Sequence, residues 1–94
     1  MIIVSGSIRV DASDRAAYLE GCRAVIVAAR NAPGCVDFHI SADPIDAERV
    51  NVYEQWETVA AVEAFRGSGP SDEQSTAMHD IAVFQHEIAS STKL

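Results

Sequence analysis

Hydrophobic and polar residues alternate over the first ten positions of the chain. The hydrophobic register holds Ile2, Val4, Ile8 and Val10, and the polar register holds Ser5, Ser7 and Arg9. A period of two over this length is typical of a strand with one buried face. We therefore predict a strand over residues 2–10.

The next segment has the spacing of an amphipathic helix. Its hydrophobic stripe consists of Tyr18, Cys22, Val25, Ile26 and Ala29, which follow one another at i, i+4, i+7, i+8 and i+11. The helix is predicted to begin at about residue 13, with Asp11 or Ser13 as its N-cap. Residues 31–34, Asn-Ala-Pro-Gly, end it, because proline cannot continue a helix and glycine supplies the turn.

Two strands joined by a turn follow this helix. The first is predicted over residues 35–41, where Val36, Phe38 and Ile40 alternate with polar residues. A turn begins at Asp43, which precedes a proline, and the next strand covers residues 48–56. This strand has hydrophobic or aromatic residues in both registers, so neither of its faces is purely polar.

The last third of the chain predicts a second helical region in two pieces and a final strand. Thr58 is expected to cap a short helix that ends at Gly67. Residues 67–70 read Gly-Ser-Gly-Pro, a loop signal, and residues 71–74 have the spacing of a capping box that opens another helical turn or two. The final strand is predicted over residues 82–89.

This order of elements predicts a single α+β domain that spans residues 1–94. It is a ferredoxin-like β-α-β-β-α-β fold, with helices packed on one face of an antiparallel sheet. The other face of the sheet is left uncovered and is not cleanly polar. We therefore expect a second subunit to cover that face, so that the protein is a homodimer through its sheet faces.

Composition and charge narrow the function. The 94 residues carry 7 basic and 14 acidic side chains, a net charge of −7, so nucleic acid and anionic membrane surfaces are not expected partners. The chain has no stretch of the ~20 apolar residues that span a membrane, and its start does not resemble a signal peptide. We expect a cytoplasmic protein whose Cys22 and Cys35 are reduced.

The familiar catalytic motifs are missing from the sequence. It has no Gly-x-Ser-x-Gly elbow, no Gly-rich nucleotide loop and no Cys-x-x-Cys pair, and its histidines lack the helical spacing of metal ligands. We therefore expect no metal and no cofactor. The chemistry that remains must use aromatic residues, histidines and a pocket.

Four residues are candidates for that chemistry: Trp56, Glu54, His79 and His39. Glu54 shares a register with Trp56, which places a carboxylate beside an indole. His79 precedes the final strand beside a Gly-Pro loop, a common border of a cleft. Each candidate also has a structural interpretation: a core or interface Trp, a paired Glu, and exposed or packed histidines.

Several of these segments resemble the antibiotic biosynthesis monooxygenase family. The resemblance rests on residues 33–35 (Pro-Gly-Cys), on residues 43–44 (Asp-Pro), and above all on residues 53–57 (Tyr-Glu-Gln-Trp-Glu) before a short helix. It implies a dimeric α+β barrel of two ferredoxin-like subunits packed sheet to sheet. It also implies direct oxidation of phenols or quinols by dioxygen, without metal, flavin or nicotinamide.

The resemblance implies roles for particular residues. Trp56 would shape the pocket wall, and His79 would transfer the proton, with Glu54 or His39 as alternatives. Val52, Val62 and Phe65 stand where relatives carry polar or aromatic pocket residues, a departure that favours an apolar cavity. A haem-degrading branch uses an Asn, a Trp and a His, whose positions here read Ser7, Phe65 and His79. Only the histidine survives, which disfavours haem degradation.

Three functional hypotheses result. The first is a cofactor-independent monooxygenase that acts on a quinol or phenolic polyketide-like molecule. The second is a non-catalytic dimeric module that binds a small hydrophobic ligand, or haem. The third is an isomerase on the same scaffold, since some barrel relatives rearrange lactones.

Overall fold

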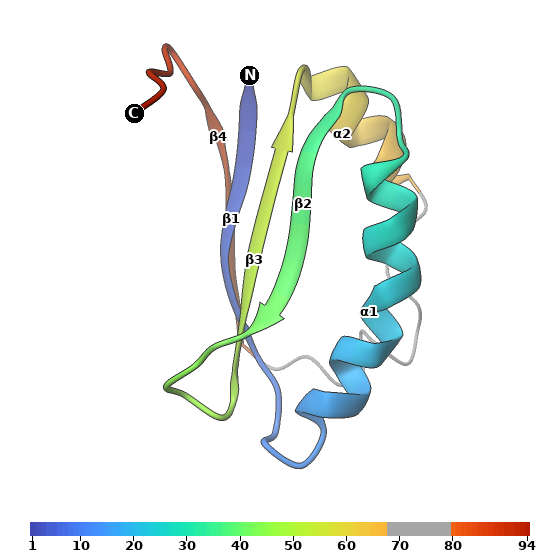
Figure 1. The fold of residues 1–94 in the computed structure, drawn as a ribbon, viewed down its shortest axis with the longest axis vertical. Coiled ribbons are helices and arrows are strands. Elements are labelled where there is room, and N and C mark those ends of the chain that lie inside the picture. Colours follow the sequence, from blue (N-terminus) through green and yellow to red (C-terminus); the bar gives the residue numbers. More distant parts are fainter. Residues whose placement is uncertain (68–79) are drawn as a thin grey trace.

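The computed structural model describes residues 1–67 and 80–94 of the chain. The elements are β1 (Ile2–Arg9), α1 (Arg15–Arg30), β2 (Cys35–Ala42), β3 (Arg49–Trp56), α2 (Val59–Arg66) and β4 (Ile81–Glu87), shown in Figure 1. The predicted β-α-β-β-α-β order is confirmed. The second piece of the second helical region, predicted from residue 71, lies outside the described residues.

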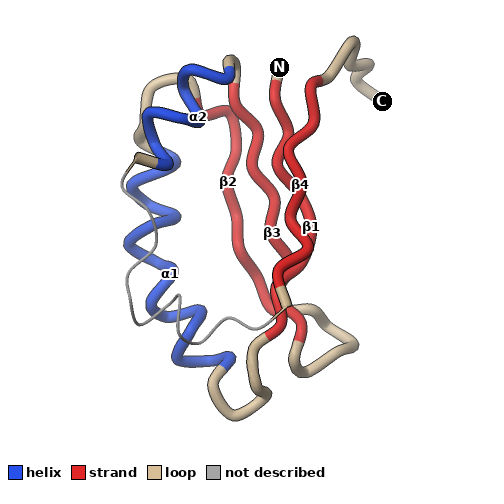
Figure 2. The backbone as a smooth tube through the Cα atoms, turned by 180° about the vertical axis from the view of Figure 1, so that it is seen from behind, coloured by secondary structure: helices blue, strands red, loops and turns tan. Residues whose placement is uncertain are grey.

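The four strands form one sheet in the order β2-β3-β1-β4, and every neighbouring pair is antiparallel. Both helices lie on the same side of this sheet, and in the part of the chain that is described its other side has no cover (Figure 2). This arrangement confirms the predicted ferredoxin-like α+β fold. The two central strands, β1 and β3, therefore hold the most enclosed side chains.

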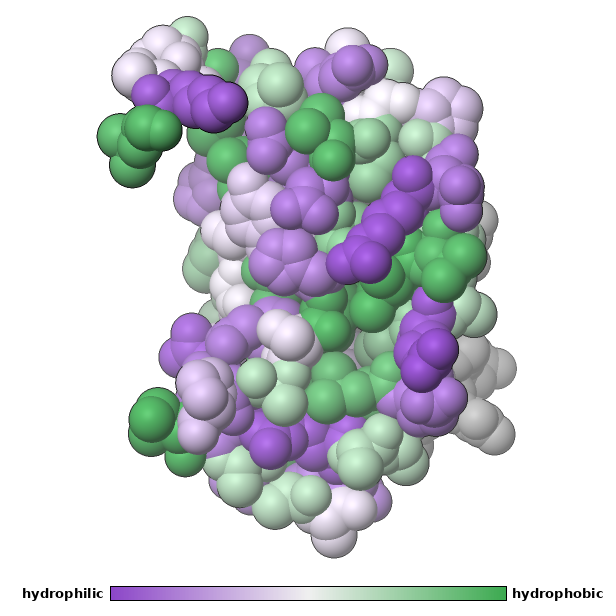
Figure 3. All heavy atoms as spheres, viewed as in Figure 1, coloured by the Kyte–Doolittle hydropathy of each residue, from purple (hydrophilic) through white to green (hydrophobic). Residues whose placement is uncertain are grey.

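The core lies between the sheet and the helices, as the two periodicities predict. The inward residues of β1 that were predicted as one face are at most 7% exposed, and so are Val50, Val52 and Trp56 of β3. From α1, Tyr18 and Cys22 of the predicted stripe are buried against them. In the space-filling view, hydrophobic side chains show between the sheet and α1 amid a largely hydrophilic surface (Figure 3).

The predicted inward position of Val36 is wrong. Cys35 pairs with Trp56 and Phe38 pairs with Glu54, so β2 uses one more residue than β3 between these pairs, and the register shifts at this point. Such a bulge takes one residue out of the alternation. Val36 is consequently 50% exposed, whereas Phe38 is buried.

The two helix starts differ in how well the sequence predicted them. Thr58 caps α2 as predicted, because its Oγ1 accepts a hydrogen bond of 3.1 Å from the backbone N–H of Ala61. For α1 the N-cap is Asp14, not Asp11 or Ser13, and its side chain makes no capping hydrogen bond. Arg15, the first residue of α1, instead contacts the loop between β2 and β3, which lies at the same end of the fold as the start of the helix (Figure 1).

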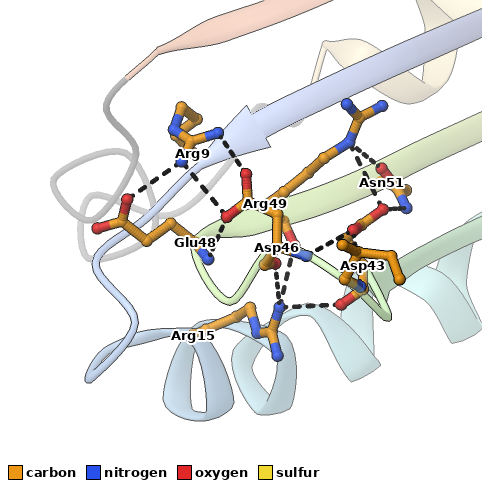
Figure 4. A network of polar contacts seen from close by, with 8 residues as sticks. Arg9, Arg15, Asp43, Asp46, Glu48, Arg49 and Asn51 are labelled. Carbon is orange, nitrogen blue, oxygen red and sulfur yellow. Dashed lines mark hydrogen bonds and ion pairs between the residues drawn. The ribbon is translucent and has the colours of Figure 1, made fainter.

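Arg15 ties α1 to the loop between β2 and β3 (Figure 4). Its Nη1 donates to the backbone carbonyls of Asp43 (3.2 Å), Asp46 (2.9 Å) and Arg49 (3.3 Å). A guanidinium has enough N–H donors to bind several backbone carbonyls that would otherwise be hydrogen-bonded to water. This contact joins the first turn of α1 to the loop between β2 and β3 at one end of the sheet.

Within the same loop, Asp43 organises the turn that the sequence predicted. Its carboxylate accepts hydrogen bonds from the Asn51 side chain and from the backbone N–H groups of Asp46 and Ile45. These bonds favour the charged form and lower the pKa of Asp43 to about 2. The turn is therefore held by an ionised carboxylate at all ordinary pH values.

The uncovered face of the sheet carries a mixed set of side chains. Tyr53 of β3 is stacked on His39 of β2, with ring centroids 5.1 Å apart, and Ser5 of β1 pairs with Tyr53 on one side and Phe84 on the other. Phe84 is 63% exposed. None of the described helices is long and apolar enough to cross a membrane.

Candidate functional site

A pocket of about 760 Å³ lies between α1 and the helix-facing side of the sheet. Strands β1 and β3 contribute Val4, Ile8 and Val52 to its walls, α1 contributes Tyr18, and α2 contributes Phe65. Ligand sites in proteins have volumes of roughly 300–1,000 Å³ and mainly apolar walls with a few polar groups. The pocket thus has the size and lining of a site for a small aromatic molecule.

One buried carboxylate faces this pocket. Glu54 lies two residues before Trp56 on β3, so both side chains point to the same face of the sheet, as predicted. Trp56 Nε1 donates a hydrogen bond of 2.9 Å to Glu54 Oε1. Glu54 is 9% exposed and is the only charged residue in the buried part of the described chain. The indole N–H orients the carboxylate through Oε1, and the other carboxylate oxygen of Glu54 can still accept a hydrogen bond from a ligand.

Burial raises the pKa of Glu54 above its ordinary value. The hydrogen bond from Trp56 and then the positive charge of Arg66 act in the opposite direction, but they do not cancel the effect of burial. A carboxylate with a raised pKa is a stronger base than an exposed one. Glu54 is therefore suited to take a proton from a bound ligand at neutral pH.

Aromatic rings support this carboxylate from the side of α2. Phe65 lines the pocket and lies 5.3 Å from the Trp56 ring and 5.7 Å from the Phe38 ring, measured between centroids. Trp56 itself is fully buried and contributes no surface to the pocket. Its predicted place in the wall is thus taken by Phe65, and Trp56 contacts both Phe65 and Glu54.

Two further groups on the wall come from α1. Burial raises the pKa of the Tyr18 hydroxyl well above its ordinary value and raises that of the Cys22 thiol as well. Both side chains therefore stay protonated at neutral pH, and neither can act as the base. They were predicted only as part of the hydrophobic stripe of the helix.

The other residues proposed from the sequence do not gather at this pocket. His39 lies on the opposite face of the sheet, with its Nε2 3.7 Å from Asp37 Oδ2. Ser7 also belongs to the register opposite to that of Ile8, so it is not on the pocket wall. Val62, on the inward side of α2, is fully buried in the core. His79 lies outside the described residues.

The sequence reasoning missed a pair of polar residues on the pocket wall. Arg66, in the last turn of α2, donates from Nη1 to Gln85 Oε1 of β4 at 2.9 Å, and both residues line the pocket. One signal was present in the sequence. Arg66 follows Val62 by four positions, so an inward Val62 brings Arg66 to the same side of the helix.

The positions implied by haem-degrading relatives are not assembled in the described part of the structure. Phe65 lines the pocket, Ser7 lies on the opposite sheet face, and His79 is not described. Residues 1–67 and 80–94 contain no group of three or more His, Cys, Asp or Glu side chains placed to hold a metal ion.

Comparison with known proteins gives a family match. The model of the family described as "Antibiotic biosynthesis monooxygenase" matches residues 1–80. No curated protein matches the chain.

Solved structures with the same fold come from several organisms. A proposed antibiotic biosynthesis monooxygenase from Nitrosomonas europaea is 18% identical, with a TM-score of 0.85, and the match covers 96% of this chain and all of that one. A proposed monooxygenase of the same type from Deinococcus radiodurans is 17% identical, with a TM-score of 0.81 over 100% and 98% of the two chains. A conserved protein from Methanosarcina mazei is 16% identical, with a TM-score of 0.79 over 90% and 89%. At these identities the likeness shows the fold.

Proposed function

The chain belongs to the antibiotic biosynthesis monooxygenase family, and from this premise we propose that it is a cofactor-independent monooxygenase. Its substrate is a quinol or phenolic polyketide-like molecule, which it oxidises with dioxygen. The observation that carries the proposal is the placement of Glu54. A buried carboxylate of raised pKa, hydrogen-bonded to Trp56 Nε1 at 2.9 Å, faces an apolar pocket of about 760 Å³.

The chemistry needs little beyond these groups. Glu54 removes a phenolic proton, which turns the bound ring into an electron-rich phenolate that gives one electron to dioxygen. The resulting pair recombines with a new C–O bond. For a hydroquinone, the ring gains one oxygen atom and becomes a hydroxyquinone, and the second oxygen atom leaves as water with two of the hydrogens. The apolar walls exclude bulk water, which limits loss of the reactive oxygen species.

The proposed active unit is a homodimer joined through the uncovered sheet faces. Support comes from the exposed Phe84 and from the stacked Tyr53 and His39 on that face. On this proposal His39 is buried at the subunit contact, on the side of the sheet away from Glu54.

Replacement of Glu54 by Gln tests the proposed base. Glu54→Gln keeps the shape and can accept the bond from Trp56, but it cannot take a proton. We expect oxygen uptake with a panel of hydroquinones and anthrones to fall by about 100-fold or more, a typical contribution of a general base. The matched control is Glu63→Gln on the exposed face of α2, which loses the same charge and keeps full activity.

Two outcomes would contradict the proposal. One is oxygen uptake by the metal-free wild type that never exceeds the autoxidation rate of the panel. The other is unchanged turnover in Glu54→Gln together with lost turnover in His79→Ala, which would return the proton transfer to the histidine first suggested by the sequence.

The second candidate function is a non-catalytic dimeric module that holds a small hydrophobic ligand. The apolar Val52 on the pocket wall favours it, because this position offers no polar group to a reacting oxygen. Tight binding of the same quinols without any oxygen uptake would select this function over the monooxygenase.

A further inference from the structure

Arg66 and Gln85 form a polar contact on the pocket wall, and this contact uses only part of the hydrogen-bonding capacity of the Arg66 guanidinium. Arg66 comes from the last turn of α2 and Gln85 from β4, and their contact of 2.9 Å joins two residues that are 19 positions apart in sequence. A guanidinium has five N–H donors, and the partner here is a neutral amide oxygen rather than a carboxylate. Among residues 1–67 and 80–94, Gln85 is the one hydrogen-bond partner of the Arg66 guanidinium, so as far as the described residues go most of its donors remain available to a ligand.

Charge makes this position unusual in the molecule. Arg66 and Glu54 are the only charged residues among the described residues that line the pocket, and the chain as a whole carries −7. An anionic ligand would be repelled by such a protein unless a fixed cation received it. Arg9 and Arg49 cannot do so, because both are paired with carboxylates of the loop between β2 and β3.

The sheet register sets the distance between the two polar ends of the pocket. Val4 of β1 pairs with Glu54 on one side and with Gln85 on the other, so the three residues form one row across the sheet. Neighbouring strands are separated by roughly 4.8 Å, so the backbones at Glu54 and Gln85 are about 10 Å apart. Apolar Val4 fills the space between them. A ligand of two fused aromatic rings with a polar group at each end fits this pattern.

We propose that Arg66 and Gln85 form a subsite for the carboxylate of a hydroxyaryl carboxylate whose phenolic end meets Glu54. The guanidinium offers two parallel N–H donors to the carboxylate oxygens, and the Gln85 amide N–H adds a further donor. This inference names the substrate class of the proposed monooxygenase and rests on that proposal for the role of Glu54. It concerns binding alone, so it is tested without oxygen chemistry.

The test compares two fluorescent probes, 6-hydroxy-2-naphthoate and 2-naphthol, which differ only in the carboxylate. Their dissociation constants are measured by fluorescence titration at pH 7 with the wild type and with Arg66→Gln. We expect the substitution to weaken naphthoate binding by at least about tenfold, the value of a charge-assisted hydrogen bond, and to leave naphthol binding within about twofold. Arg23→Gln, at an exposed site on α1 away from the pocket, is the matched charge control and should change neither.

Two further variants separate recognition from a merely structural contact between α2 and β4. Arg66→Lys keeps the positive charge but loses the two parallel N–H donors of the guanidinium. It should therefore bind the naphthoate less tightly than the wild type and more tightly than Arg66→Gln. Gln85→Glu supplies Arg66 with an internal carboxylate and should weaken naphthoate selectively, even if Arg66→Gln fails to fold. Equal losses for both probes in these variants would overturn the subsite, because they would indicate damage to the pocket.

The subsite is also overturned if the wild type binds neither probe, or shows no preference for the naphthoate. Its failure is distinct from that of the proposed function. Selective naphthoate binding without oxygen uptake by any quinol would retain the subsite and reject the monooxygenase. If oxygen uptake occurs and Arg66→Gln leaves it unchanged for both acidic and neutral substrates, the monooxygenase is retained and the subsite is rejected.

Discussion

Glu54 and Trp56 show how a two-residue spacing on a strand becomes a chemical unit. The spacing places both side chains on one face, and the fold then buries the pair under α2, where Phe65 contacts Trp56. Burial alone would favour a neutral carboxyl group, and the donated indole N–H partly restores the charged form. The pKa of Glu54 is therefore set by burial, which raises it, against the indole hydrogen bond and the charge of Arg66, which lower it, and the indole bond can be removed by a single substitution.

Trp56→Phe removes the hydrogen bond and keeps an aromatic ring. The bond lowers the pKa of Glu54, so its loss should raise that pKa further, and a base that must be ionised becomes active only at higher pH. We expect the acidic midpoint of the pH–rate profile of oxygen uptake to rise relative to wild type, because the proton now dissociates later. A midpoint that stays in place or falls would show that Glu54 is not the titrating base.

At the scale of elements, the caps and the bulge show where local sequence is sufficient. Thr58 precedes a clear hydrophobic pattern and caps α2 as predicted, since its side chain reaches only three residues along the chain. Val36 follows the alternation of its own strand but is displaced by a register shift that depends on the partner strand. The bulge could not be predicted, because no residue within β2 encodes the position of β3.

The Thr58 cap also provides a test of the element that carries Phe65 and Arg66. Thr58→Ala should lower the free energy of unfolding by about 1 kcal/mol, the usual cost of a lost N-cap. Urea unfolding followed by circular dichroism measures it, and Thr58→Ser, which keeps the hydroxyl, should remain close to wild type. An equal loss in both variants would mean that the methyl group, not the cap, is what stabilises α2.

At the scale of the whole molecule, one sheet face is covered by the helices and the other carries exposed aromatic side chains. Proteins seldom leave such a surface to water when a second copy can bury it. The pocket, by contrast, is built from all four strands and both helices of a single chain. The proposed dimer would thus stabilise the sheet without supplying the groups that face Glu54.

Ser5→Arg tests the proposed contact between sheet faces. Ser5 lies at the middle of β1, an internal strand, in register with Tyr53 and Phe84. A charge placed there would be buried without a partner in a dimer, so we expect sedimentation to show monomers where the wild type sediments as dimers. Ile45→Arg, at a site 92% exposed in the loop between β2 and β3, should leave the dimer intact. A wild type that is monomeric would reject the contact altogether.

The sequence by itself determined the order of elements, the inward face of β1, and the juxtaposition of Glu54 with Trp56. Each of these follows from a hydrophobic pattern with a period of two or 3.6 residues, which can be recognised within a short segment of the chain. The tertiary structure decided which inward side chains open to a pocket: Phe65 does, whereas Val62 is enclosed in the core. It also brought Arg66 to Gln85. Such contacts depend on how distant elements pack, and no local pattern contains that information.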